Sequence, residues 1–237
     1  MDEIRVVFGD DHILVIDKPP GMPSVPARTP LDPPSVTERL TARFGPVEAV
    51  HRLDRDTSGL LVVARSSAAR AALGRAFEAR SVAKRYLAVV AGRLPRARGT
   101  ICLPLAADPH TPPRQRIDPI IGRRAETRWW EAGMAAAAGG MRSLVVLEPV
   151  TGRSHQLRAH LAWLGAPIVG DRLYGGPAAE LLALHAASLE FPHPLHGRRV
   201  SAEAPPPDTP TWTAFSVGLD QARRSVGRNA DGPTCDQ

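Results

Sequence analysis

The densest group of polar side chains that could perform chemistry is the segment HRLDRDTSG, residues 51–59. Two carboxylates, Asp54 and Asp56, lie among two arginines, Arg52 and Arg55, directly before the apolar run LLVVA. Polar residues at the entrance to a buried strand are held in place by a rigid sheet, and sites tend to lie there. This segment is therefore a candidate site. The alternative is a solvated loop with local ion pairs.

A second group, TGRSHQLRAHL (residues 151–161), places Arg153 and Arg158 at the start of an expected helix. The N-terminus of a helix carries the positive end of the macrodipole, so a cation there is disfavoured unless an anion compensates it. That anion is either a phosphate or a carboxylate elsewhere in the protein. The alternative is a surface arginine with a small energetic cost.

A third group is the triplet Lys84, Arg85 and Tyr86, at the start of an expected strand. An aromatic ring beside two cations suits stacking on a nucleobase while the phosphate is held nearby. The alternative is an ordinary aromatic residue of a strand. Taken together, the three groups indicate a site for an anionic partner.

Other kinds of site lack their sequence signatures. GxGxxG, GxxxxGK[ST] and GxSxG are all absent, so the dinucleotide, P-loop and nucleophile-elbow fingerprints are excluded. His155 and His160 do not have the spacing of HExxH, and Cys102 and Cys235 form no CxxC pair. The sequence therefore predicts no metal site.

The charge balance favours an anionic partner. The 237 residues carry 30 basic and 24 acidic side chains, a formal net charge of +6. Lys18 and Lys84 are the only lysines, and a GC-rich genome explains the arginine bias. No apolar stretch approaches the ~20 residues of a transmembrane helix. The N-terminus lacks secretory features, and two cysteines are too few for a disulfide framework. These features predict a cytoplasmic protein with no membrane partner.

The order of the expected elements favours an α+β fold over a doubly wound sheet. Strands are expected within 5–18 and at 60–64, 85–90, 125–130 and 143–147, a last core segment at 184–191, and helices at 36–44, about 67–79 and 154–163. Ser35 and Glu38 have the spacing of a capping box for the first helix, and Ser66 or Ser67 is expected to cap the second. Residues 9–11 form a turn signal between the first two strands. Residues 93–124 are expected to be mostly irregular, and the Ala-rich insert 133–140 to be a long mobile loop. We expect one catalytic domain over residues 1–221 and a disordered tail over 222–237.

Six segments together resemble the signature motifs of the RluA-type RNA pseudouridine synthases. They are DDHILVIDKPPGMPSVP (10–26), HRLDRDTSGLLVVAR (51–65), KRYLAVVAGRLP (84–95), GRRAET (122–127), TGRSHQLRAHLAWLGAPIVGDRLYGG (151–176) and LHAASLEFPHP (184–194). The resemblance covers nearly the whole chain. It implies a mixed, mostly antiparallel sheet with flanking helices and loops around a central catalytic cleft. It also implies the branch of the family that lacks an S4 RNA-binding domain.

The resemblance implies three catalytic residues. Asp54, rather than Asp56, is the implied catalytic aspartate, Tyr86 stacks on the uracil, and Arg158 pairs with the Asp54 carboxylate. The implied reaction isomerises uridine to pseudouridine in structured RNA, in 23S ribosomal RNA, transfer RNA or both. It needs no cofactor, because nothing is oxidised and no group leaves for good. The target nucleotide must leave its helix or loop to reach the site.

The expected RNA contacts lie at the rims of these motifs, and the protein is expected to be a monomer. The contact residues are Arg52, Lys84, Arg85, Arg114, Arg116, Arg153, His155 and Gln156. Two other classes of function remain open. One is a catalytically silent RNA-binding or RNA-chaperone protein on the same fold, which the intact catalytic residues disfavour. The other is a hydrolase that uses Asp54 and Asp56, which predicts metal dependence or free uracil as a product.

Overall fold

The chain alternates between two structural units. The computed structural model describes residues 4–26 and 33–224. The first unit consists of Met1–Arg85 and His185–Pro206, and the second of Tyr86–Leu184 and Pro207–Gln237. The boundaries fall inside strand β5 (Ala83–Ala91) and at the start of strand β11 (Leu184–Pro192). Each unit therefore contains segments that are far apart in the sequence.

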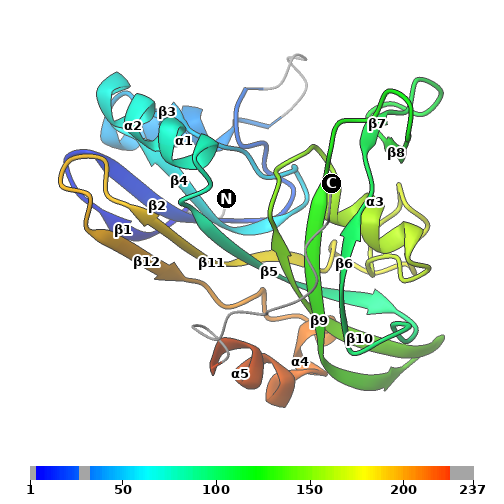
Figure 1. The fold of residues 1–237 in the computed structure, drawn as a ribbon. Coiled ribbons are helices and arrows are strands. Elements are labelled where there is room, and N and C mark those ends of the chain that lie inside the picture. Colours follow the sequence, from blue (N-terminus) through cyan, green and yellow to red (C-terminus); the bar gives the residue numbers. More distant parts are fainter. Residues whose placement is uncertain (1–3, 27–32, 225–237) are drawn as a thin grey trace. The chain divides into compact units, whose positions relative to one another are not determined.

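The first unit contains a mixed sheet covered on one face by a helix (Figure 1). Besides β11, its elements are β1 (Arg5–Gly9), β2 (Ile13–Lys18), α1 (Val36–Phe44), β3 (Glu48–Ala49), β4 (Ser58–Ala64), α2 (Ser67–Glu78) and β12 (Arg199–Glu203). β4 pairs antiparallel with β2 and β3 and parallel with β11, and β12 pairs antiparallel with β11. Leu73 of α2 is buried in one cluster with Val15, Val62 and Phe191, so this helix closes the core over β2, β4 and β11.

Gly59 allows the parallel contact between β4 and β11. It pairs with Ala186 and has a φ of 106°, a backbone conformation that side chains disfavour. A Cβ atom at this position would overlap with the backbone of Ala186. Glycine is therefore required at the point where the candidate catalytic segment enters the sheet.

Both helices of the first unit begin as the sequence predicts. Ser35 caps α1 by accepting a hydrogen bond from the Glu38 backbone N–H, and the Glu38 carboxylate accepts one from the Ser35 backbone N–H. This reciprocal pair is the predicted capping box. The side chain of Ser66 caps α2 by accepting from the Ala69 backbone N–H. The strands around Asp10 and before Arg65 are also confirmed, although β4 begins two residues earlier than expected.

The second unit is built on an antiparallel sheet with the order β5-β10-β9-β6 (Figure 1). Besides β5, its elements are β6 (Arg98–Cys102), β7 (Leu105–Ala107), β8 (Gln115–Ile117), β9 (Glu126–Ala137), β10 (Gly140–Pro149), α3 (Gln156–Trp163), α4 (Pro210–Thr213) and α5 (Ser216–Arg224). β7 and β8 form a separate small hairpin. Strands in both units pair mostly antiparallel and helices are few, so the predicted α+β class is confirmed.

Two expectations for the second unit are wrong. The Ala-rich insert is not a long loop: β9 and β10 continue through it and meet at a tight turn, where Gly139 and Gly140 have positive φ. Pairing with β10 satisfies the backbone of the alanines, which overrides their low strand propensity. Residues 93–124 are also more ordered than expected, because they contain β6, β7 and β8.

The C-terminal elements were not predicted from the sequence. β12, α4 and α5 follow the last expected core segment, and α5 packs on β9, where Gly218 lies against the Ala132 carbonyl. The predicted domain boundary at residue 221 stays a prediction: α5 runs to Arg224, and 225–237 lie outside the described residues. No helix in the described part of the chain has both the length and the apolar character needed to cross a membrane.

Candidate active site

Asp54 lies on a turn that leads directly into β4. Its backbone carbonyl accepts a hydrogen bond of 3.2 Å from the Thr57 N–H, which closes the turn over residues 54–57. Leu53 before it and Thr57 after it are buried, whereas Asp54 is half-buried. The carboxylate is therefore carried by a backbone that is fixed on both sides.

The segment KPPGMPS (residues 18–24) clamps the backbone on either side of Asp54. The Ser24 hydroxyl donates to the Leu53 carbonyl (2.8 Å) and accepts from the Leu53 N–H (3.0 Å). The Arg55 Nε donates to the Gly21 carbonyl at 3.1 Å. The same segment receives the start of α1, because the Val36 N–H donates to the Pro23 carbonyl. Hydrogen bonding to residues distant in sequence thus holds the turn.

Lys18 is the centre of this clamp and was not singled out from the sequence. Its side chain is fully buried, and its Nζ donates to the carbonyls of Pro19 (2.9 Å), Met22 (2.9 Å) and Arg55 (2.8 Å). Three carbonyls around one point suit a compact ammonium better than a planar guanidinium. Lysine is rare in this arginine-rich chain, and that rarity was the available signal.

Burial lowers the pKa of Lys18 from 10.5 to about 7, and the negative charges of Asp56, Asp54 and Asp17 oppose this shift. Desolvation disfavours the charged ammonium, while nearby carboxylates favour it. The charge of Lys18 is therefore coupled to the candidate catalytic carboxylate.

His51 supports the other end of the segment as a neutral acceptor. Its Nε2 accepts a hydrogen bond from the Val62 N–H at 3.2 Å, and its ring packs against Phe77 with centroids 4.7 Å apart. Desolvation, with a smaller contribution from the nearby Lys84 cation, lowers the pKa of His51 from 6.5 to about 3. His51 is therefore neutral in the folded protein at neutral pH.

We expect His51 to make stability depend on acid pH. Because its folded pKa lies below its unfolded pKa, the unfolded chain binds more protons between pH 6.5 and 3. The stabilisation is complete above pH 6.5 and falls by up to about 1.4 kcal/mol per pH unit below it. Urea unfolding at a series of pH values should show a flatter dependence for His51→Gln than for the wild type. Equal slopes would contradict the burial of a neutral His51.

In the second unit, Arg158 is the third residue of α3. It binds a carboxylate, which is one of the two anions, phosphate or carboxylate, expected from the sequence. Its side chain is buried, with 7% of the residue exposed. Nε and Nη2 donate to the two oxygens of Asp171, both at 2.8 Å. The guanidinium also lies 5.2 Å from the centre of the Tyr174 ring. A bidentate pair of this kind fixes both the position and the plane of the guanidinium.

Asp171 is a buried residue that sequence reasoning missed. Its side chain is inaccessible to solvent, and Oδ1 also accepts from the backbone N–H groups of Leu173 and Tyr174. Asp171 is thus fixed by its own turn and holds Arg158 in place. The available signal was its presence in the GDRLYGG part of the motif at residues 151–176. The expected pairing of Arg158 with Asp54 stays a prediction.

Three of the predicted residues, Arg114, His155 and Arg158, lie against Tyr174. The Arg114 guanidinium lies 5.4 Å from the ring centre, and Arg158 also lies over the ring. The His155 Nδ1 is 3.2 Å from the Tyr174 hydroxyl, and this hydroxyl accepts a hydrogen bond from the Gln115 N–H at 2.8 Å. These contacts connect the β7–β8 hairpin to the start of α3.

Gln156 is buried and holds the loop before α3. Its Oε1 accepts from the Thr151 hydroxyl (2.7 Å) and the Arg153 N–H (3.0 Å), and its Nε2 donates to the Glu126 carbonyl (2.9 Å). Only 3% of the residue is exposed. The geometry therefore gives Gln156 a positioning role.

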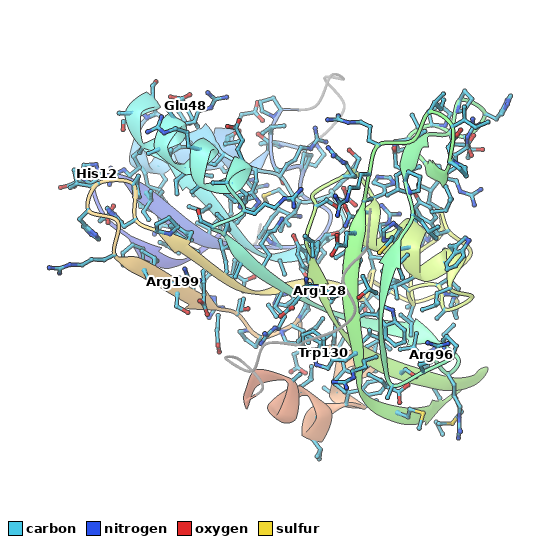
Figure 2. All side chains as sticks on the ribbon, viewed as in Figure 1. His12, Glu48, Arg96, Arg128, Trp130 and Arg199 are labelled. Carbon is cyan, nitrogen blue, oxygen red and sulfur yellow. The ribbon has the colours of Figure 1, made fainter. Side chains whose placement is uncertain are left out.

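Glu126 links the GRRAET segment to the same loop. Its N–H donates to the Thr151 hydroxyl, and its carboxylate accepts from Arg124 at 3.1 Å. Arg128 lies further along β9, 3.9 Å from the Glu126 carboxylate, and is labelled beside Trp130 in Figure 2. This motif therefore supports the loop structurally.

The other predicted residues differ in their surroundings. Arg52 is exposed. Lys84 is half-buried with its Nζ 5.9 Å from the Phe77 ring, and desolvation lowers its pKa. Tyr86 on β5 pairs with Leu147 of β10, directly after the half-buried Arg85. Arg116 pairs with Asp118 at 2.8 Å, and the Arg153 Nε donates to the Arg124 carbonyl.

A carboxylate on a clamped turn in one unit, and a buried arginine among cations and a tyrosine in the other, fit an enzyme for an anionic substrate. The family model for RNA pseudouridylate synthase matches residues 12–163.

Three relatives carry the name "Dual-specificity RNA pseudouridine synthase RluA". The protein of Escherichia coli O6:H1 is 42% identical over 204 residues, covering 84% of this chain and 92% of the relative. The Haemophilus influenzae protein is 40% identical, with coverages of 85% and 92%. The Vibrio vulnificus protein is 43% identical, with coverages of 80% and 78%. The chain therefore belongs to the RNA pseudouridylate synthase family, among its RluA-type members, and is an isomerase.

Solved structures show the same fold. "Human RNA Pseudouridylate Synthase Domain Containing 1" superposes with a TM-score of 0.78 at 28% identity, covering 98% of this chain and 97% of the other. "Human RNA Pseudouridylate Synthase Domain Containing 4" gives a TM-score of 0.68 at 23% identity, with coverages of 92% and 92%. The predicted pseudouridine synthase fold is confirmed.

Proposed function

We propose that this enzyme isomerises uridines in stem-loops of both ribosomal and transfer RNA, with Asp54 as its catalytic residue. The names of its bacterial relatives describe them as dual-specificity enzymes, which supports two classes of RNA substrate for this enzyme. The observation that supports Asp54 most strongly is the clamp, in which Lys18 and Ser24 hold the backbone on either side of this one carboxylate. A solvated surface loop would not need such a construction.

The reaction explains why a carboxylate is needed. The bond between N1 and C1′ breaks, the uracil turns, and C5 bonds to the same C1′ atom. The C5 proton is lost and N1 takes up a proton, so substrate and product have the same composition. Asp54 either attacks C1′ or takes a proton from the ribose, and both alternatives require the ionised carboxylate. The reaction requires no cofactor.

Arg158 and Tyr86 complete the proposed catalytic group. Arg158 pairs with the Asp54 carboxylate and favours its ionised form. Asp171 already binds two nitrogens of this guanidinium and fixes its plane. Tyr86 stacks on the uracil and assists removal of the C5 proton. The target nucleotide reaches these residues only after it has left its stack.

The proposed RNA contacts are six arginine or lysine residues and His155. They are Arg52, Lys84, Arg85, Arg114, Arg116, Arg153 and His155. Gln156 serves binding indirectly, because its buried amide fixes the loop that carries Arg153 and His155. Phosphate neutralisation by such residues supplies most of the non-specific affinity.

Substrate size tests this proposal. Tritium release from RNA that carries 5-tritiated uridine reports loss of the C5 proton. We expect a hairpin of anticodon-arm size to be modified nearly as fast as full-length transfer RNA, because a protein of this size reads a short stem-loop by shape. A requirement for an assembled ribosomal subunit would contradict the stem-loop proposal.

Salt dependence tests the cationic contacts. We expect log K for the hairpin to fall with log[salt] with a slope on the order of −4, and Arg114→Ser to reduce that slope by about 1. Arg199→Ser is the matched control, because Arg199 lies on β12, is labelled in Figure 2 and pairs with Glu190. Identical slopes for Arg114→Ser and the wild type would remove Arg114 from the RNA contact.

A further inference from the structure

The loop after β8 exposes two large apolar side chains at neighbouring positions. Ile120 is 92% exposed and Ile121 is 68% exposed. Ile120 has the highest exposure among the exposed large hydrophobic residues of the described part of the chain. While both side chains are exposed to water, the favourable free energy of burying their apolar surface is not gained. We therefore expect them to contact a partner molecule.

A defined turn presents these two side chains. The Asp118 Oδ1 accepts hydrogen bonds from the backbone N–H groups of Ile120 (3.0 Å) and Ile121 (3.1 Å), and the Gly122 N–H donates to the Asp118 carbonyl at 3.0 Å. Arg116 donates twice to Oδ2 of the same carboxylate, at 2.8 and 3.2 Å. Together with the two N–H groups, this lowers the pKa of Asp118. The turn is therefore stable across the neutral pH range.

The turn is also packed against the chain behind it. The Asp118 N–H donates to the Pro104 carbonyl, and a Cβ atom on Gly122 would overlap with the Asp118 carbonyl. Leu105 and Arg123 exchange two backbone hydrogen bonds, of 2.8 and 3.0 Å. Ile120 and Ile121 therefore lie at the tip of a turn that backbone hydrogen bonds hold in place.

The surroundings of this tip are cationic. Residues 109–124 contain four arginines and one acidic residue, Asp118. Arg116 pairs with Asp118 and Arg124 with Glu126, which leaves Arg114 and Arg123 without an ion pair among the described residues. Arg114, Arg123 and Arg124 are exposed. An apolar tip among cations is complementary to a partner that combines phosphates with apolar faces, as RNA does.

The tip is connected to the residues around Arg158 within the same unit. The Gln115 N–H donates to the Tyr174 hydroxyl, and the Tyr174 ring lies beneath the Arg158 guanidinium. Figure 1 shows the β7–β8 hairpin next to α3, the helix that carries Arg158. The turn that carries Ile120 and Ile121 follows β8 in this unit, and this connection to the proposed catalytic arginine favours the RNA substrate over a membrane surface.

We propose that Ile120 and Ile121 form an apolar wedge that packs against a base or ribose of the substrate stem-loop, next to the flipped uridine. Apolar side chains that insert at base steps stabilise unstacked nucleic acid, and flanking arginines bind the phosphates. This inference rests on the proposed RNA-modifying function and adds the apolar half of substrate recognition.

The test compares two double variants of the full-length protein. Ile120→Ser with Ile121→Ser should weaken the Kd for the hairpin about tenfold and leave the salt slope unchanged, because no cation is removed. Ile120→Leu with Ile121→Leu keeps the apolar surface and should retain wild-type affinity. Val217→Ser is the control, because this exposed residue on α5 lies in the same unit. The three proteins should have the same thermal unfolding midpoint as the wild type.

Three outcomes would overturn the wedge. One is an unchanged Kd for the serine variant, and another is an equal loss for the leucine variant. The third is a serine variant that keeps its RNA affinity but no longer binds anionic phospholipid vesicles or no longer self-associates. If the wild-type protein formed no pseudouridine, the proposed function would be contradicted instead. The comparison of Kd values would still test the wedge, because it measures binding and not turnover.

Discussion

Replacement of Asp54 by asparagine is expected to reduce pseudouridine formation by at least about a thousandfold, because a neutral amide can neither attack C1′ nor take a ribose proton. RNA affinity should change little, and the free energy of unfolding should fall only slightly, because the Asp54 charge also favours the buried Lys18 ammonium. The backbone of the turn is held by Ser24 and Lys18, and those hydrogen bonds do not involve the Asp54 side chain. Single-turnover kinetics on the hairpin, with Kd and urea unfolding measured in parallel, would check all three expectations.

Asp56→Asn is the matched control. Asp56 lies two residues away on the same turn, is exposed and loses the same charge on substitution. Its activity should stay within about tenfold of wild type, since it is not required to touch the sugar. Loss of activity in the Asp56 variant with retention in the Asp54 variant would show that the catalytic residue has been assigned wrongly.

The second large effect is expected for Arg158→Lys, about a hundredfold in kcat. An ammonium cannot bind both oxygens of Asp171 and also keep the plane in which the guanidinium is presented. The buried Asp171 carboxylate would lose one of its charge-assisted hydrogen bonds, so stability should fall by about 1–3 kcal/mol. Activity must therefore be measured well below the unfolding midpoint of the variant.

Arg172→Lys controls for the change of residue type. Arg172 is exposed and adjacent to Asp171, so the same substitution there should leave kcat unchanged. Asp171→Asn should reproduce part of the Arg158→Lys defect, because it weakens the same pair from the other side. Wild-type kcat in the folded Arg158→Lys protein would exclude Arg158 from catalysis.

Local signals made much of the fold predictable. The Ser35 and Glu38 capping box, the Ser66 cap and the turn after β1 depend on residues close in sequence, and all are present. Apolar runs likewise identify β4 and β5 as buried strands. These features follow from local hydrogen bonding and from side-chain periodicity, both of which are visible in a single sequence.

Other features depend on partners distant in sequence. The Ala-rich part of β9 is a strand because β10 pairs with it, and nothing in its own composition indicates this. Lys18 binds the carbonyl of Arg55, 37 residues away, and Arg158 binds Asp171 across a helix and a turn. Motif resemblance identified the segments that contain these residues, but only the structure shows which atoms they contact.

As a pseudouridine synthase, this chain isomerises uridine without releasing the base. The most direct measurement incubates the purified protein with a uridine-containing hairpin in the presence of a metal chelator, then quantifies nucleosides and free bases by mass spectrometry. We expect one pseudouridine for each uridine lost, no free uracil and no effect of the chelator. Free uracil, or activity that disappears with the chelator, would show a hydrolase, and unchanged RNA would show a binding protein without catalysis.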